Sequence, residues 1–234
     1  MSPSSVPNSP LDVGVLLPAA GRGERAGAGD IKQFRPIAGV PMLLRAVRPF
    51  ANHVRVRQIV IALPQEHVAR PPDWLADLVG QRLRTVGGGA TRAASVRAAL
   101  RALDPACTLV LVHDAARPFV SQAEIDEVIA ATERTGGALA AIPISDTVKR
   151  AGRDRTVAET VPRDDLWRAL TPQGFSRRVL EEAYARAGDD WEATDDAALV
   201  AAAGTPVVLV EGRTTNIKVT TPDDFLLAEA LANR

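Results

Sequence analysis

The sequence predicts an α/β protein in which helices cover both faces of a mainly parallel sheet and a β-arm protrudes from it. Short apolar runs alternate along the chain with segments whose apolar residues recur every three or four positions. The first pattern is typical of buried strands and the second of amphipathic helices. Strands that alternate with helices of this length need crossover connections, which make neighbouring strands parallel.

The individual elements follow from these two patterns. The apolar runs predict strands at residues 13–18, 58–63, 109–113, 138–142 and 207–210. The three- and four-residue spacing predicts helices at residues 41–50, 91–103, 123–135, 176–187 and 222–232. In such sheets, ligands bind at the carboxyl ends of the strands. The residues that follow each strand are therefore the first candidates for a functional site.

The arm is expected at residues 143–163, where the alternation of strands and helices stops. Two polar, β-prone segments, 147–150 and 156–161, flank a turn at Gly152. They contain few large apolar side chains, and an isolated two-stranded hairpin is only marginally stable in water. We therefore expect the arm to lie on another surface, as a dimerisation arm in a homodimer.

Composition limits the classes of function. The 234 residues are 46% hydrophobic, enough for a full core, and the 28 basic residues balance the 28 acidic ones. No overall field therefore attracts nucleic acid or an anionic membrane. No apolar run approaches the roughly 18 residues that span a bilayer, and residues 1–10 predict a disordered tail without targeting features. Cys107 is the only cysteine, which favours the reducing cytoplasm over a disulfide framework.

A glycine-rich loop follows the first expected strand. It contains Pro18, Ala19, Ala20, Gly21, Gly23 and Arg25, and Lys32 follows shortly after. Small residues let the backbone approach a polyanion, and free N–H groups beside cations form a phosphate site. The alternative is a flexible basic loop. A dinucleotide fingerprint is not supported, because no acidic residue stands about 20 positions further on, and a Gly-Lys-Ser/Thr P-loop is absent.

Polar residues also follow other expected strands. Asp114 and Arg117 come directly after the strand at 109–113, where they could bind a ribose, a Mg²⁺ ion or a phosphate, or simply close a turn. Residues 87–95 could meet a ligand through bare glycine backbone or only begin a helix. The histidines lack metal-ligand spacing and no serine lies in a nucleophile elbow, which favours direct transfer.

Taken in order, these segments resemble the 2-C-methyl-D-erythritol 4-phosphate cytidylyltransferases, the CTP-dependent enzymes of the non-mevalonate isoprenoid pathway. The most specific matches are residues 18–21 with 32–34, His-Asp-Ala-Ala-Arg-Pro at 113–118, Leu-Thr-Pro-Gln at 170–173 and Asn-Ile-Lys-Val-Thr at 216–220. The resemblance implies a Rossmann-like nucleotidyltransferase domain over residues 11–234, a homodimer whose arms exchange, and Mg²⁺ or another divalent cation as cofactor.

The resemblance also implies roles for single residues. The catalytic cations would be Arg25, Lys32 and Lys218. The nucleotide would contact Pro18, Ala19, Ala20, Gly21, Gly23, Gly88, Gly89, Ser95, Asp114 and Ala115, and Asp114 would lie near a metal held mostly by the CTP phosphates. Methylerythritol phosphate would be bound by Arg117, Thr147, Arg163, Thr171 and Thr194, with Thr147 and Arg163 reaching across the dimer. Ala90 stands where some members carry an acid, so base selection would rest more on backbone contacts.

The expected reaction is transfer of CMP from CTP to 2-C-methyl-D-erythritol 4-phosphate with release of pyrophosphate. One alternative is a ribitol 5-phosphate cytidylyltransferase with the same fold. Another is a regulatory protein that binds CTP without turnover. The Pro-Ala-Ala-Gly loop and residues 216–220 favour methylerythritol phosphate, and the set of cations argues against a purely regulatory role.

Overall fold

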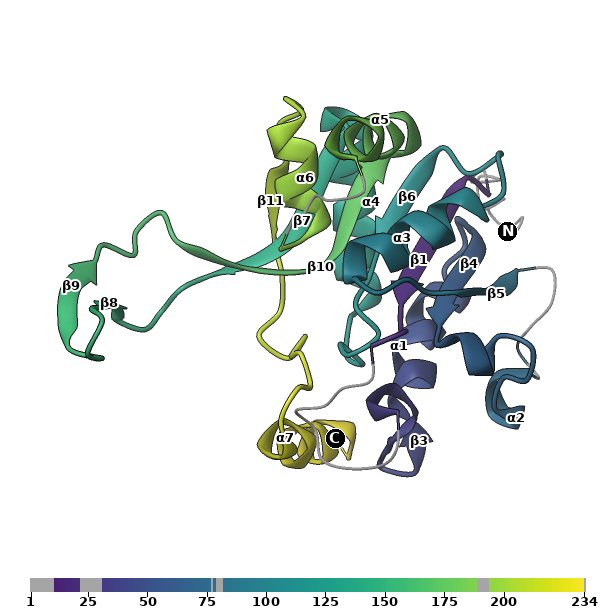
Figure 1. Ribbon diagram of the computed structural model, residues 1–234, viewed down its shortest axis with the longest axis horizontal. Helices are drawn as coiled ribbons and strands as arrows, with labels where there is room; N and C mark the ends of the chain where they lie inside the picture. Colours follow the sequence, from purple (N-terminus) through teal and green to yellow (C-terminus); the bar gives the residue numbers. More distant parts are fainter. Residues whose placement is uncertain (1–10, 22–30, 77, 79–81, 189–193, 234) are drawn as a thin grey trace, which may run out of the picture.

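The computed structural model of the protein describes residues 11–21, 31–76, 78, 82–188 and 194–233. Within these residues, a seven-stranded sheet with the order β11-β7-β10-β6-β1-β4-β5 forms the centre (Figure 1). Its strands are β1 (Val13–Pro18), β4 (Val56–Leu63), β5 (Leu83–Gly87), β6 (Leu109–Val112), β7 (Gly137–Pro143), β10 (Trp167–Ser176) and β11 (Val208–Glu211). Only β10 runs antiparallel to its neighbours within this sheet. The predicted mainly parallel sheet is confirmed.

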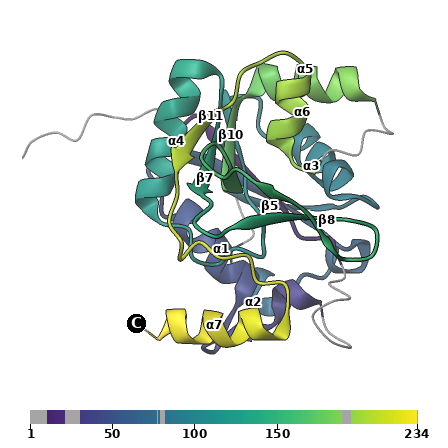
Figure 2. The same cartoon turned by 90° about the vertical axis from the view of Figure 1, so that its left-hand side faces the viewer.

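Two layers of helices cover the sheet. One face carries α1 (Met42–Ala51) and α4 (Gln122–Thr135), and the other carries α3 (Arg92–Arg101), α5 (Arg177–Ala187) and α6 (Asp196–Ala202) (Figure 2). The pleat of β1 shows why both layers are needed. Val13, Val15 and Leu17 pack toward α1 and α4, whereas Leu16 packs toward α3. Since side chains alternate across a strand, a continuous apolar strand must be covered twice.

A third, smaller apolar cluster lies outside the two layers of helices that cover the central sheet. Helix α7 (Pro222–Ala232) packs there through Phe225 and Ala228 against Ile37 and Met42. Ile37 belongs to the short strand β2 (Pro36–Ile37), which pairs with β3 (Val40–Pro41). This cluster holds the chain shortly after the 3₁₀ helix Lys32–Phe34, through Ile37, and it includes Val219 from residues 216–220. Both segments contribute residues to the site.

The predicted arm is present. Strands β7 and β10 pair beyond the body of the sheet, and β8 (Val148–Ala151) pairs antiparallel with β9 (Val157–Val161) at the tip. Figure 1 shows that the tip projects far from the helical layers. Val157 and Trp167 on this arm are 66% and 38% exposed. The arm therefore has little apolar support within one protomer.

All predicted strands and helices occur with small shifts at their ends, but β5, β10, α6 and short elements such as β2, β3 and α2 (Asp73–Ala76) were not among the predicted ranges. Strand β10 contains Pro172 and Gly174, both of which disfavour strands, and its pairing with two neighbours overrides that preference. Helix α6 begins at residue types typical of a helix start, with Asp195 as its N-cap. The predicted tail at residues 1–10 lies outside the described residues. None of the helices described is long and apolar enough to cross a membrane.

Candidate active site

A cleft of about 580 Å³ opens at the carboxyl ends of β1 and β6, a size suited to a small-molecule ligand. Four segments that are distant in the sequence line it: the loop after β1, the start of α3 with the preceding loop, the turn after β6, and residue 218. The lining residues are Pro18, Ala20, Gly21, Lys32, Gln33, Gly89, Ala90, Thr91, Arg92, Ser95, Asp114, Ala115, Ala116 and Lys218. The structure thus brings most predicted nucleotide-binding residues together.

Gln33 holds the loop that follows β1. Its buried side-chain Nε2 donates to the carbonyl oxygens of Ala19 and Gly21, at 3.1 and 2.8 Å. The neighbouring Lys32 donates from Nζ to the carbonyl oxygen of Val219 at 2.9 Å. The 3₁₀ helix therefore joins the small-residue loop to the segment that carries Lys218. The predicted residues Gly23 and Arg25 lie outside the described residues.

The glycine loop after β5 packs directly on the loop after β1. A Cβ on Gly88 would lie 2.3 Å from the Cβ of Ala20, so only glycine fits here. The amide of Gly88 donates to the carbonyl of Leu63 at 2.8 Å, and that of Gly89 donates to Ser95 Oγ at 3.1 Å. The Ser95 hydroxyl in turn donates to the carbonyl of Thr91 at 3.0 Å. Both amide hydrogens are thereby used inside the protein.

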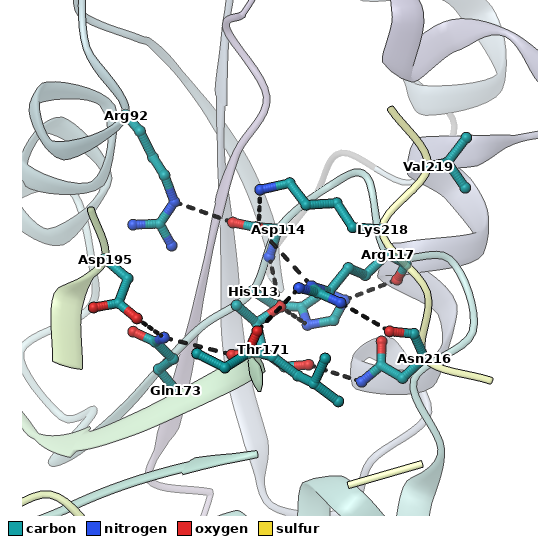
Figure 3. A network of polar contacts seen from close by, with 12 residues as sticks. Arg92, His113, Asp114, Arg117, Thr171, Gln173, Asp195, Asn216, Lys218 and Val219 are labelled. Atoms are coloured by element: carbon teal, nitrogen blue, oxygen red, sulfur yellow. Dashed lines mark hydrogen bonds and ion pairs between the residues drawn. The ribbon is translucent and has the colours of Figure 1, made fainter. Parts of the chain in front are cut away.

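Asp114 is the carboxylate at the centre of the cleft (Figure 3). Its Oδ1 accepts from Arg92 Nε at 3.0 Å and its Oδ2 accepts from Lys218 Nζ at 2.8 Å. Arg117 Nε lies 4.0 Å from Oδ2. Burial acts to raise the pKa of this carboxyl, but Arg92 and Lys218 outweigh it and hold the pKa well below its usual range. Asp114 therefore stays ionised at neutral pH.

Arg92 connects Asp114 to a second, fully buried carboxylate. Arg92 Nη1 lies 2.6 Å from Asp196 Oδ2, and the hydroxyl of Tyr184 donates to Asp196 Oδ1 at 2.6 Å. Asp196 is only 1% exposed. Burial acts to lower the pKa of Arg92, but Asp196 and Asp114 together raise it above its ordinary value. This network couples the starts of α3 and α6 to the turn after β6.

His113, Thr171 and Arg117 form a layer behind the cleft (Figure 3). Thr171 Oγ1 lies 3.1 Å from the amide nitrogen of Asp114 and 2.9 Å from His113 Nδ1. His113 Nε2 lies 2.9 Å from the carbonyl oxygen of Arg117, whose Nη1 donates to the carbonyl of Asn216 at 2.8 Å. Burial lowers the pKa of His113 to about 4. His113, Thr171, Arg117 and Asn216 are all buried, and none of them lines the cleft.

The remaining predicted acceptor residues are exposed and lie outside the cleft. Thr194 lies just before α6, and Thr147 and Arg163 lie at the arm. Arg163 Nη1 donates to the carbonyl of Ser145 within the arm. Within one protomer, the structure does not bring these three residues together with Lys32 and Lys218.

The side chains of the cleft could hold a metal ion only together with a bound ligand that supplies further oxygen atoms. In the part of the chain that the structure describes, no group of three or more His, Cys, Asp or Glu side chains could hold an ion. Asp114 is the one carboxylate in the described lining of the cleft. A divalent cation here would need most of its oxygen ligands from a bound phosphate chain, which Mg²⁺ commonly accepts.

Known proteins of similar sequence identify the family of the chain. The sequence model of the family 2-C-methyl-D-erythritol 4-phosphate cytidylyltransferase matches residues 13–234. The chain belongs to this family. It is 46% identical to the 2-C-methyl-D-erythritol 4-phosphate cytidylyltransferase of Salinibacter ruber, a match that covers 93% of this chain and 91% of the relative. Its identity to the enzyme of that name from Frankia casuarinae is 45%, over 95% and 82% of the two chains.

A solved structure shows the same fold. The crystal structure of 2-C-methyl-D-erythritol 4-phosphate cytidylyltransferase from Thermus thermophilus superposes with a TM-score of 0.81 at 39% identity. The match covers 95% of this chain and 100% of the other. The Rossmann-like nucleotidyltransferase fold that the sequence predicted is confirmed.

Sequence reasoning missed three residues that shape the cleft: Gln33, Arg92 and Asp196. Arg92 lies within the glycine-rich segment 87–95, and a cation at the start of a helix that follows a strand was the available signal. Gln33 stands next to Lys32 in a matched motif but has no charge to draw notice. Asp196 is an acidic residue in the first turn of a helix, a common position, and only the tertiary structure shows that it is buried and paired with Arg92.

Replacing Arg92 with Gln should lower the free energy of unfolding by about 3 kcal/mol, because a buried ionised carboxylate at Asp196 loses its cation. Urea denaturation measures this loss. Arg92→Gln combined with Asp196→Asn should cost less than the sum of the two single changes. Arg178→Gln, which breaks an exposed pair with Glu182, is the control and should cost under about 0.5 kcal/mol. Equal losses for Arg92 and Arg178 would contradict this role.

The low pKa of His113 predicts a dependence of stability on pH. Its pKa is about 4 in the folded protein and 6.5 as the ordinary value, so only the unfolded chain takes up this proton between these pH values. Stability should therefore fall by about 3 kcal/mol as the pH drops from 6.5 to 4. Urea denaturation of the wild type and of His113→Gln across this range checks it. Parallel curves for the two proteins would show that His113 does not cause the decline.

Proposed function

We propose that this chain transfers CMP from CTP to 2-C-methyl-D-erythritol 4-phosphate, releasing pyrophosphate and forming 4-diphosphocytidyl-2-C-methyl-D-erythritol. The observation that carries the proposal is the cleft lined by the cations Lys32, Arg92 and Lys218 and by one carboxylate, Asp114, which pairs with Arg92 and Lys218. Such an excess of cations suits a triphosphate and a second phosphorylated substrate. Membership of the cytidylyltransferase family supports both substrates.

The nucleotide would lie across the loops after β1 and β5. We place the phosphates along Pro18, Ala20 and Gly21, where small residues permit close approach of the backbone. The base would lie against Gly88, Gly89 and Ser95. The amide hydrogens of both glycines are engaged inside the protein, so the exocyclic amine of cytosine would donate to their carbonyl oxygens. The carbonyl oxygen of Gly89 also lies 3.5 Å from Ser95 Oγ and has a second lone pair for such a contact. Ala90 supplies no charge here, which supports base selection by backbone contacts.

The transfer step brings together two anions. A phosphate oxygen of methylerythritol phosphate forms a bond to the α-phosphorus of CTP, while the bond from that phosphorus to the leaving pyrophosphate breaks. Lys32 and Lys218, together with Arg25, would offset the repulsion and stabilise the charge that develops in the transition state. Lys218 lies 2.8 Å from Asp114 Oδ2, so it would have to share or leave this oxygen when phosphates arrive. No covalent enzyme intermediate is required.

A divalent cation, Mg²⁺ or another, would add further positive charge on the triphosphate. Asp114 is the residue that would hold it, with the remaining ligands from the phosphates. Its depressed pKa keeps the carboxylate ready for such an ion at neutral pH. Ala115 would lie beside the ribose in the same turn.

The acceptor site would be completed by a second protomer. Thr147 and Arg163 are exposed on the arm, and Val157 and Trp167 leave apolar surface uncovered. A homodimer that exchanges arms would cover this surface and bring both polar residues to the partner's cleft. Thr194 would close the site from the side of α6. Arg117 and Thr171 are buried behind the cleft and do not line it. Their direct contact with the acceptor, which the family resemblance implies, stays a prediction.

We also place the reaction in the cytoplasm. Cys107, the only cysteine of the chain, is buried, and burial raises the pKa of its thiol to about 11. The fold therefore does not depend on an oxidising compartment.

The direct test is release of pyrophosphate by the purified chain with CTP, Mg²⁺ and methylerythritol phosphate. We expect turnover with this acceptor and with CTP in preference to other nucleoside triphosphates. Turnover only with ribitol 5-phosphate would replace the acceptor in the proposal. CTP binding without pyrophosphate release from any acceptor would instead support a regulatory protein.

Changing Lys32 to Ala should lower turnover by roughly two to three orders of magnitude, as is typical when one group that stabilises transition-state charge is lost. Pyrophosphate release at saturating substrates measures this. Arg178→Ala, a change of an exposed cation on α5, is the control and should retain wild-type turnover. Near-normal turnover of Lys32→Ala would remove this residue from the mechanism.

A mixed dimer should test whether Arg163 acts across protomers. Neither Lys32→Ala nor Arg163→Ala alone should be active, because each homodimer lacks one group in both sites. If the arms exchange, a heterodimer of the two variants contains one site with both groups intact and should recover about half of the wild-type activity. Co-purification with two different tags yields this heterodimer. No recovery would show that Arg163 acts within its own protomer, and an active Arg163→Ala homodimer would show that this residue has no role in turnover.

A further inference from the structure

A buried chain of hydrogen bonds runs behind Asp114, and its geometry fixes where each proton lies. The carbonyl oxygen of Arg117 can only accept, so His113 Nε2, at 2.9 Å, must carry a hydrogen. In the neutral ring, Nδ1 is then an acceptor and receives the hydroxyl hydrogen of Thr171 at 2.9 Å. Thr171 Oγ1 in turn accepts from the amide of Asp114 at 3.1 Å.

This arrangement leaves Thr171 no hydrogen for a substrate. A threonine hydroxyl has a single hydrogen, and here it is donated to His113. The residue is 3% exposed, and its backbone carbonyl accepts from Asn216 Nδ2 at 2.9 Å. The hydroxyl group and the backbone carbonyl of Thr171 are therefore both hydrogen-bonded to other residues of the protein.

The same chain closes the turn that carries the site. The amide of Arg117 donates to the carbonyl of Asp114 at 2.9 Å, and the carbonyl of Ala116 accepts from the amide of Val219 at 2.8 Å. The turn thus sets the direction of the Asp114 side chain and also holds the residue next to Lys218. His113 itself is fixed against the ring of Phe50, with 4.9 Å between ring centres. A change at Thr171 or His113 reaches both partners of the ion pair in the cleft.

We propose that Thr171 and His113 are positioning residues for the nucleotide: their hydrogen bond fixes the turn after β6 and thereby holds Asp114 and Lys218 in place to receive the phosphates of CTP. This inference rests on the proposed function, since it assigns CTP to the cleft. The proposal distinguishes two roles for Thr171, namely direct contact with the acceptor and action on CTP through Asp114. A residue that touches the acceptor affects the acceptor alone, whereas a residue that acts through Asp114 affects CTP.

The test compares Thr171→Val, which keeps the shape but removes the hydroxyl, with Thr171→Ser, which keeps the hydroxyl. Calorimetry measures CTP binding with Mg²⁺ and without acceptor, and steady-state pyrophosphate release gives KM for methylerythritol phosphate. We expect Thr171→Val to bind CTP about tenfold more weakly, because the two buried hydrogen bonds of this hydroxyl, to His113 and from the Asp114 amide, are lost. Thr171→Ser should stay within about threefold of the wild type. At saturating CTP, KM for the acceptor should change little.

His113→Phe provides an independent variant, because it keeps a ring of similar shape but removes the acceptor of the Thr171 hydroxyl without touching the cleft. It should weaken CTP binding to a similar extent, and the double variant with Thr171→Val should be no worse than either single one. Thermal unfolding confirms that each variant is folded, and Thr171→Ala replaces Thr171→Val if the latter does not fold.

Two results would overturn the inference. One is wild-type CTP binding by Thr171→Val together with a raised KM for methylerythritol phosphate, which indicates direct contact with the acceptor. The other is additive losses in the double variant. Wild-type protein that binds CTP but releases no pyrophosphate would refute the proposed function instead, and the CTP-binding comparison would still stand.

Discussion

The carboxylate of Asp114, shared between Arg92 and Lys218, is the interaction on which the rest of the site depends. It lies where the end of β6, the start of α3 and residues 216–220 meet. These segments contribute cations that would repel one another across an empty cleft. A single buried negative charge therefore holds them together, and the second carboxylate, Asp196, keeps Arg92 from turning toward solvent.

The balance of charge in this network explains how a stable site can still attract a polyanion. Asp114 compensates part of the positive charge of Arg92 and Lys218, while Lys32 adds a further cation to the cleft. The net excess is local, because the whole chain carries equal numbers of acidic and basic residues. A triphosphate can therefore replace internal ion pairs without the protein bearing a strong field elsewhere.

The antiparallel strand β10 gives the site its rigid back wall. It lies between β6 and β7, and so it brings Thr171 beside the turn after β6 and Gln173 beside α6. Gln173 donates to Asp195 Oδ2 at 2.9 Å and accepts from the amide of Ala197 at 2.9 Å. The same strand continues into the arm, so one element links the back of the cleft to the proposed dimer contact.

The sequence by itself determined the alternation of strands and helices and the candidate residues Lys32 and Asp114, because periodicity is local and parallel strands deliver their following loops to one edge of the sheet. The order of its motifs identified the family, and the resemblance added Lys218. Only the tertiary structure decided that Arg92 meets Asp196 and that Thr171 and Arg117 lie behind the cleft. Their positions depend on β10 entering the sheet between β6 and β7, and the Pro172 and Gly174 in this strand conceal it from local patterns. Strand β10 is stabilised by pairing with strands that are distant in the sequence. Local residue preferences do not reveal this pairing, so only the tertiary structure shows where these residues lie.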